Sequence, residues 1–175
     1  ITYITEKMVY KKSSVSNYNY HPKTKEELQD IIKQLVEERG QNGDFNDIDT
    51  SEITDMSKLF FEMKDFNGDI SKWNVSNVTD MNNMFKHCKS FNQPLNEWDV
   101  SNVTNMRWMF SDCISFNQPL DKWNVSNVTD MSCMFWECES FNKDISKWNA
   151  HKVEMMGAMF YDCPIEEKYK PKRFR

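Results

Sequence analysis

The sequence predicts an α/β repeat fold, a right-handed solenoid of five 25-residue coils, each made of a short strand, a turn and a short helix. Three observations predict it: a motif that recurs every 25 residues, apolar spacings that change from a strand period to a helix period within each repeat, and an amphipathic segment ahead of the first repeat. We expect an N-terminal arm and capping helix in 1–40, the solenoid in 41–164 and a basic tail in 165–175.

The repeat is clearest in four segments that begin with Phe-Asn and reach a Trp seven residues later. These segments are 66–73, 91–98, 116–123 and 141–148. Asn42-Gly43-Asp44 lies 25 residues before Asn67-Gly68-Asp69, so the register extends backwards into less similar sequence. We therefore expect coils at 41–65, 66–90, 91–115, 116–140 and 141–164.

Within one coil the apolar residues suggest a strand followed by a helix. In 91–115 they begin Leu95-x-x-Trp98-x-Val100, the L-x-x-L-x-L spacing of a leucine-rich repeat. Trp98 and Val100 alternate as in a short strand. The three-residue steps from Val103 to Met109 are typical of a helical turn.

A single coil buries too little apolar surface to offset the entropy of ordering its backbone, so equivalent positions of successive coils must stack into columns. The expected structural columns are Trp73, Trp98, Trp123 and Trp148; Asn67, Asn92, Asn117 and Asn142, preceded by Asn42; and Cys88, Cys113, Cys138 and Cys163. We interpret the asparagines as hydrogen-bond partners of buried backbone rather than as ligands. The column cysteines are interpreted as small buried thiols, with a disulfide between adjacent coils as the alternative. Cys133 lies outside this column and is expected to be a solvent-accessible thiol.

The first coil needs a cover, and the segment before it has the signals of a helix over about 24–39. Thr24 and Glu27 form a capping box, and Gly40 provides a stop. An apolar stripe expected to face Ile48 and Leu59 consists of Leu28, Ile31, Ile32, Leu35 and Val36. Residues 1–20 are expected to form an added strand or an arm, and 165–175 to fold over the last coil.

Composition and motifs exclude several classes of function. The net charge of −5 argues against a nucleic-acid partner, and no run approaches the ~20 apolar residues of a membrane helix. Neither an apolar signal-peptide core nor an initiator Met is visible, which suggests a mature or trimmed form and leaves the localisation open. With three His, no Cys-x-x-Cys pair, no nucleophile elbow and no phosphate loop, we expect no enzyme, no metal and no cofactor.

Positions that vary between coils are the candidates for recognition. Two such columns bring together Trp108, Cys133, Trp136 and Tyr161, which we take as the candidate partner-binding residues. Their packing beneath the C-terminal tail is an equally good interpretation of the sequence.

The unit W-[ND]-V-S-N-V-T-[DN]-M-x-x-M-F-x-x-C-x-S-F-N, repeated through 41–164, resembles the BspA-like leucine-rich-repeat surface proteins of bacteria, including the repeat arrays of mycoplasma surface lipoproteins. The resemblance implies a surface or secreted protein that adheres to host proteins or to other bacteria. We therefore expect a non-enzymatic protein-interaction module, adhesin-like and host-facing. The alternative is an intracellular bacterial scaffold or regulator that binds a protein partner.

Overall fold

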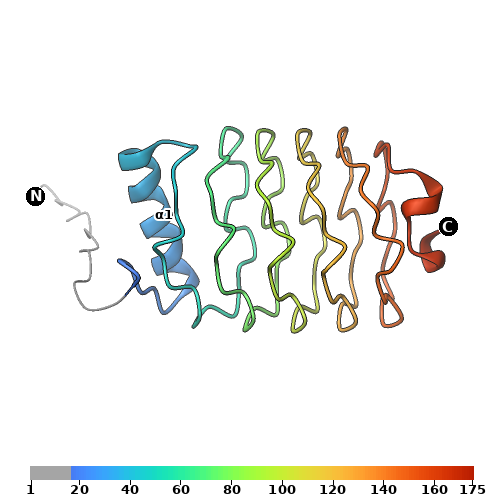
Figure 1. Cartoon of the computed structure of the whole chain (residues 1–175), viewed down its shortest axis with the longest axis horizontal. Helices are drawn as coiled ribbons and strands as arrows, with labels where there is room; N and C mark the ends of the chain where they lie inside the picture. Colours follow the sequence, from blue (N-terminus) through green and yellow to red (C-terminus); the bar gives the residue numbers. More distant parts are fainter. Residues whose placement is uncertain (1–16) are drawn as a thin grey trace, which may run out of the picture.

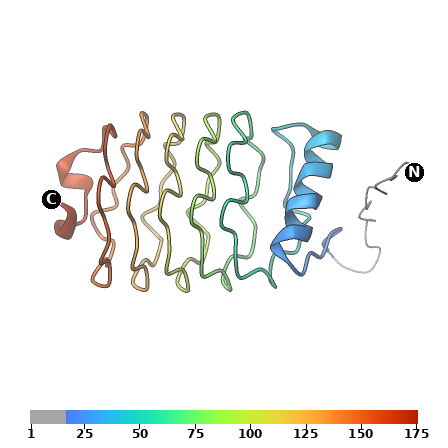
Figure 2. The same cartoon turned by 180° about the vertical axis from the view of Figure 1, so that it is seen from behind.

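The computed structural model describes residues 17–175 as one α-helix at the N-terminal end of a long stack of irregular turns (Figure 1). Two short 3-10 helices, η1 (Glu167–Tyr169) and η2 (Lys172–Phe174), lie at the opposite end, as the reverse view also shows (Figure 2). Residues 1–16, which include most of the expected N-terminal strand or arm, lie outside the described residues. The part of that segment that is described ends at Tyr20, which forms an isolated parallel bridge with Ile48.

Helix α1 (Lys25–Arg39) starts and stops where the capping residues stand. Thr24 Oγ1 accepts a hydrogen bond from the Glu27 amide at 3.2 Å, and the Glu27 carboxylate accepts one from the Lys23 amide at 2.6 Å. At the other end Gly40 has a φ of 77°, and its amide donates to the Val36 carbonyl at 2.9 Å. These bonds give hydrogen-bond partners to backbone groups at both ends of α1 that a helix leaves unpaired.

One face of α1 covers the first 25-residue segment. Its buried side chains join Ile48 and Leu59 in a single apolar cluster; they are Leu28, Ile31, Ile32 and Leu35. Two ion pairs flank this contact, Lys25 Nζ to Asp55 Oδ2 and Arg39 to Asp47 Oδ1, both at 2.7 Å. Burial alone would raise the pKa of Asp47, but hydrogen bonds from Arg39 and Asn19 outweigh it and lower that pKa.

The predicted α/β solenoid of five strand-and-helix coils is wrong, and with it the leucine-rich-repeat class. Within 41–164 the structure contains no α-helix and no sheet, only isolated parallel bridges such as Asp80 with Asn105. Neither the strand expected at Trp98 and Val100 nor the helix expected from Val103 to Met109 is present. We call the 25-residue segments 41–65, 66–90, 91–115, 116–140 and 141–164 layers, because they lie side by side along the long axis (Figures 1 and 2).

The hydrogen bonding of a layer explains why a helical spacing does not produce a helix. The Met109 amide donates to a carbonyl three residues back, that of Met106, at 3.2 Å. The amides of Trp108 and Phe110 donate instead to the next layer, to the carbonyls of residues 132 and 134, at 3.0 and 2.9 Å. An α-helix needs every amide to reach the carbonyl four residues back, and the left-handed φ of 58° at Trp108 breaks that ladder. Successive tight turns thus bury apolar side chains at every third residue, as a helix would also do.

Stacked phenyl rings run through the interior of the layers. The rings of Phe85 and Phe110 have centroids 5.5 Å apart and an interplanar angle of 7°, and those of Phe91 and Phe116 are 6.0 Å apart at 9°. Phe110 also stacks on Phe116, the first residue of the next layer, at 4.3 Å. All four side chains are completely buried, so each layer closes the apolar surface of the layer before it.

The tryptophan column links neighbouring layers through its indole nitrogens. Trp98 Nε1 donates to the Ile70 carbonyl at 3.2 Å, and Trp123 Nε1 donates to the Leu95 carbonyl at 2.9 Å. A buried indole therefore satisfies a carbonyl that no strand ladder would reach.

Candidate functional site

Three of the four predicted partner-binding residues meet on the outside of the layers. The ring centroids of Trp136 and Tyr161 lie 4.2 Å apart at an interplanar angle of 19°, and those of Trp108 and Trp136 lie 5.8 Å apart at 44°. Lys86 Nζ sits 4.0 Å from the centroid of a Trp108 ring. We call Lys86, Trp108, Trp136 and Tyr161 the outer ladder. It spans four layers, and Tyr161 at its end is 50% exposed.

The outer ladder is positioned by the tight turns that are present in place of the predicted helix. Trp108 has a left-handed φ of 58°, a conformation that is rare for a bulky residue and costs about 1–2 kcal/mol. Its amide is nevertheless fixed by the carbonyl of the next layer. The Trp136 amide donates to the Cys133 carbonyl at 3.2 Å, and the Trp136 carbonyl accepts from the Asp112 amide at 2.7 Å. The backbone that carries the two indoles is therefore hydrogen-bonded between neighbouring layers.

Cys133 does not belong to the exposed surface, so the expectation of an accessible thiol is wrong. Its side chain is only 9% exposed, and Sγ lies 3.5 Å from the Gly157 carbonyl of the next layer. Burial raises the pKa of this thiol, although Arg107 and Lys86 act in the opposite direction. Position 133 carries a left-handed φ of 56° and Trp108, at the same repeat position, one of 58°, so no local pattern indicates which of the two side chains is buried.

The four column cysteines are free thiols packed between layers. Cys113 Sγ donates to the Phe85 carbonyl at 2.9 Å, and Cys138 Sγ donates to the Phe110 carbonyl at 2.8 Å. Burial raises the pKa of both thiols. In residues 17–175 no three His, Cys, Asp or Glu side chains come together as a candidate metal site.

The asparagine column hydrogen-bonds the backbone of adjacent layers. Asn67 Oδ1 accepts from the Asn92 amide at 2.9 Å, and Asn92 Oδ1 accepts from the Asn117 amide at 2.9 Å. Asn117 Oδ1 accepts from the Asn142 amide at 3.1 Å, and the last of them, Asn142 Oδ1, accepts from the Glu166 amide at 3.0 Å. These amide oxygens are therefore already occupied by the protein itself.

A histidine and a carboxylate come together on the same outer side. His87 Nδ1 lies 2.9 Å from Asp112 Oδ2, and Lys89 Nζ lies 3.3 Å from the same oxygen. The His87 ring also contacts Phe61, with centroids 5.9 Å apart. The Asp112 carboxylate pairs with the Lys89 ammonium group and contacts the His87 ring, so these side chains form a polar network between two layers.

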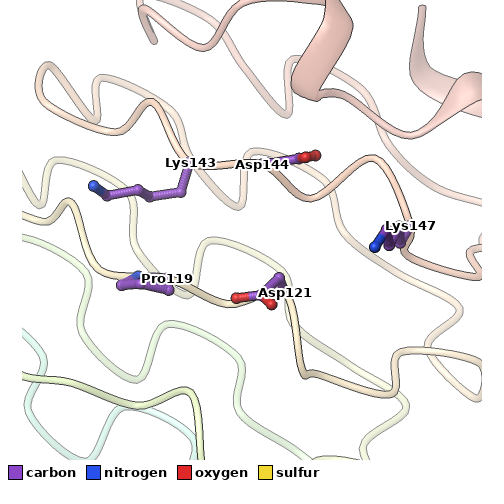
Figure 3. Close-up of a pocket in the computed structure, with 5 residues that line it drawn as sticks. All are labelled: Pro119, Asp121, Lys143, Asp144 and Lys147. Atoms are coloured by element: carbon purple, nitrogen blue, oxygen red, sulfur yellow. The ribbon is translucent and has the colours of Figure 1, made fainter.

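A shallow hollow with mixed charge lies between two layers on a different edge (Figure 3). Pro119 and Asp121 line it from one layer, and Lys143, Asp144 and Lys147 from the next. Its two carboxylates and two ammonium groups balance, and hydrogen bonds from Ser146 lower the pKa of Asp144. The hollow therefore has no excess of one charge. No sequence pattern indicates this hollow, because its residues are ordinary surface charges.

A comparison with protein-family models shows to which family the chain belongs. The model of the family described as Mycoplasma protein of unknown function, DUF285, matches residues 26–135 and 92–170. The chain belongs to this family. The two DUF285 matches overlap over 92–135, as expected where successive 25-residue layers are interchangeable. Comparison with curated proteins and with solved structures finds no match.

The DUF285 matches include all of α1 except Lys25, the layers and every residue of the outer ladder. No helix that the structure describes in this DUF285 protein combines the length and the apolar character needed to cross a membrane.

Proposed function

We propose that this chain is a non-enzymatic protein-interaction module, displayed on the bacterial surface or secreted, which adheres to a host protein through the outer ladder. The observation that carries the proposal is the continuous row formed by Trp108, Trp136 and Tyr161 on the outside of the layers. These rings are not needed to seal the interior, because separate phenyl ladders already do so. Large aromatic side chains at a surface are the residues that most often anchor protein interfaces.

The surface location is supported by the repeat unit. It resembles that of BspA-like bacterial surface proteins, and the chain belongs to a Mycoplasma family. The cation at Lys86 extends the ladder with a charged end, so a partner that presents an apolar patch beside a carboxylate fits this surface.

Capture from solubilised host extracellular matrix tests the interaction. We expect the wild-type chain to retain a protein that the double variant Trp136→Ala, Tyr161→Ala fails to retain, with recovery reduced at least tenfold. The matched control is Phe61→Ala, which removes an exposed aromatic ring from the same repeat position at the other end of the stack. Equal recovery by wild type and the double variant would exclude the outer ladder as the binding surface.

Protease treatment of intact cells tests the location. A surface protein is degraded while a cytoplasmic marker survives. Protection of the chain in intact cells, with degradation only after lysis, would contradict the adhesin proposal.

A further inference from the structure

The last layer, 141–164, ends the stack with a row of unpaired backbone amides. In the layer before it, amides of alternate residues donate to carbonyls of the last layer at 2.8 to 3.0 Å; the pairs are Met131 with Met155, Cys133 with Gly157, Phe135 with Met159 and Glu137 with Tyr161. The equivalent amides of the last layer belong to Met156, Ala158, Phe160 and Asp162, and none has an acceptor within residues 17–175. We call these four amides the open edge. Every earlier layer has this row occupied by its successor.

Side chains beside the open edge are exposed, although their equivalents in earlier layers are buried or polar. Met156 stands in the column of Met81, Met106 and Met131, which are completely buried, yet it is 39% exposed. Met155, at a position held by Asp or Asn in the other layers, is 51% exposed. Both methionines are exposed because no further layer covers them.

The C-terminal tail covers part of this end and leaves a hollow beside the open edge. The hollow is lined by Met156, Met159, Phe160, Phe174, Arg173 and Arg175. The two guanidinium groups donate to backbone carbonyls, Arg173 to that of residue 153 at 2.6 Å and Arg175 to that of residue 168 at 2.7 Å. Among the described ion pairs neither arginine has a carboxylate partner. The hollow thus has an apolar floor and a rim with two guanidinium groups, of which that of Arg175 also attracts the Asp144 carboxylate.

The geometry points to a second binding site, separate from the outer ladder, in which the open edge takes an extended acidic peptide segment of a partner protein. Carbonyls of alternate residues of that segment accept from the four open amides, in the way that the last layer accepts from the layer before it. One apolar side chain covers Met156, and a neighbouring carboxylate pairs with Arg173 or Arg175.

A second copy of the chain does not complete this edge. Its N-terminal end, whose layer would supply the matching carbonyls, is covered by α1 and its buried leucines and isoleucines. Two open edges placed against each other would oppose donors to donors, which cannot pair. Neither arrangement of a second copy of residues 17–175 therefore supplies the complementary row of acceptors.

A synthetic peptide of residues 128–139 with both cysteines replaced by serine is a suitable probe. In the structure this segment already supplies the carbonyls that accept from the corresponding amides of layer 91–115, and it carries Asp130, Glu137 and Glu139. Residue-resolved amide hydrogen exchange of the labelled full chain is measured by NMR with and without the peptide. We expect saturation to slow exchange at the four amides of the open edge by about tenfold or more, with no change at amides of the first two layers.

Two variants separate this site from the outer ladder. Arg175→Gln is expected to weaken peptide binding about three- to tenfold, whereas Trp108→Ala, which changes the outer ladder two layers away from the open edge, leaves it unchanged. Loss of host-protein capture with retained peptide binding, or the reverse, tells the two sites apart. Unchanged exchange at the four amides under millimolar peptide would overturn the proposal. So would protection of these amides in the free protein that increases with its concentration, because it would show that a second copy closes the edge.

Discussion

The indole of Trp136 stacks on the phenol ring of Tyr161, with centroids 4.2 Å apart and planes inclined by 19°, although the two residues belong to different layers. Their positions are equivalent in successive repeats, 25 residues apart. The stack therefore follows from the register of the layers rather than from local sequence. A substitution of either ring should therefore alter the exposed surface and also weaken the contact between the last two layers.

The coupling between these rings is the first prediction. Trp136→Ala and Tyr161→Ala, made singly and together, should show an interaction free energy of about 0.5–1.5 kcal/mol, because aromatic pairs contribute this much beyond their buried area. Urea unfolding of the four proteins in the cycle provides the measurement. Strictly additive losses in the free energy of unfolding would show that the two rings do not interact in solution.

The asparagine column gives the second prediction. Asn92 Oδ1 accepts from the Asn117 amide at 2.9 Å and from Gln118 Nε2 at 3.2 Å. Asn92→Ala leaves a partly buried amide without an acceptor and should reduce the free energy of unfolding by about 1–3 kcal/mol. Asn92→Asp keeps an acceptor oxygen at the same place and should lose less than half as much. If both variants unfold at the same urea concentration, the hydrogen bond to the next layer has no energetic role.

Glycine at position 68 is required by close packing, which gives the third prediction. A Cβ at this position would lie 2.6 Å from Phe45 Cδ2 and 2.9 Å from Phe66 Cε2, and both rings are completely buried. Gly68→Ala should therefore cost about 1–3 kcal/mol of the free energy of unfolding through overpacking. Gly157→Ala is the matched control, because a Cβ there meets nothing within 4 Å. Chemical denaturation of both variants is the test, and equal stability would contradict the assigned clash.

The sequence predicted which residues are buried better than it predicted the path of the backbone. Trp98, Val103, Met106 and Met109 are all buried, as stacked columns require. The same three-residue spacing is produced by an α-helix and by successive turns whose amides reach three residues back, so periodicity alone could not distinguish them. The capped helix from Lys25 to Arg39 was easier to predict, because its end signals are local.

The candidate site was predictable only in part for the same reason. Trp108 and Cys133 occupy the same repeat position with nearly the same left-handed φ, 58° and 56°, yet the thiol is buried while the indole lies in the outer ladder. Neither residue is of a type that favours this conformation. Lys86 occupies the same repeat position as Trp136 and Tyr161, but its position over the Trp108 ring depends on interlayer geometry that no local pattern encodes. The open edge is equally invisible in sequence, since Met156 occupies a column whose other members are buried.

The column thiols should make the protein less stable in alkaline solution, which is the fourth prediction. Burial raises the pKa of Cys163 from its ordinary value of 9.0 to about 11. Below about pH 8.5 this thiol is protonated in both folded and unfolded chains, so its contribution to stability is fully present. Above that pH the unfolded chain loses the proton while the folded chain keeps it, and stability falls by about 1.4 kcal/mol per pH unit until the folded thiol also ionises near pH 11.

Comparison with Cys163→Ala isolates this effect from the lysines and tyrosines that titrate in the same range. The free energy of unfolding of the wild type minus that of the variant should be constant from pH 6 to 8, then decrease by about 2 kcal/mol by pH 10.5. Urea unfolding at half-unit pH intervals under reducing conditions measures this difference. A difference that stays flat to pH 10.5 would show that the folded protein ionises this thiol as readily as the unfolded chain does, and hence that the tail and the last layer do not exclude water from it.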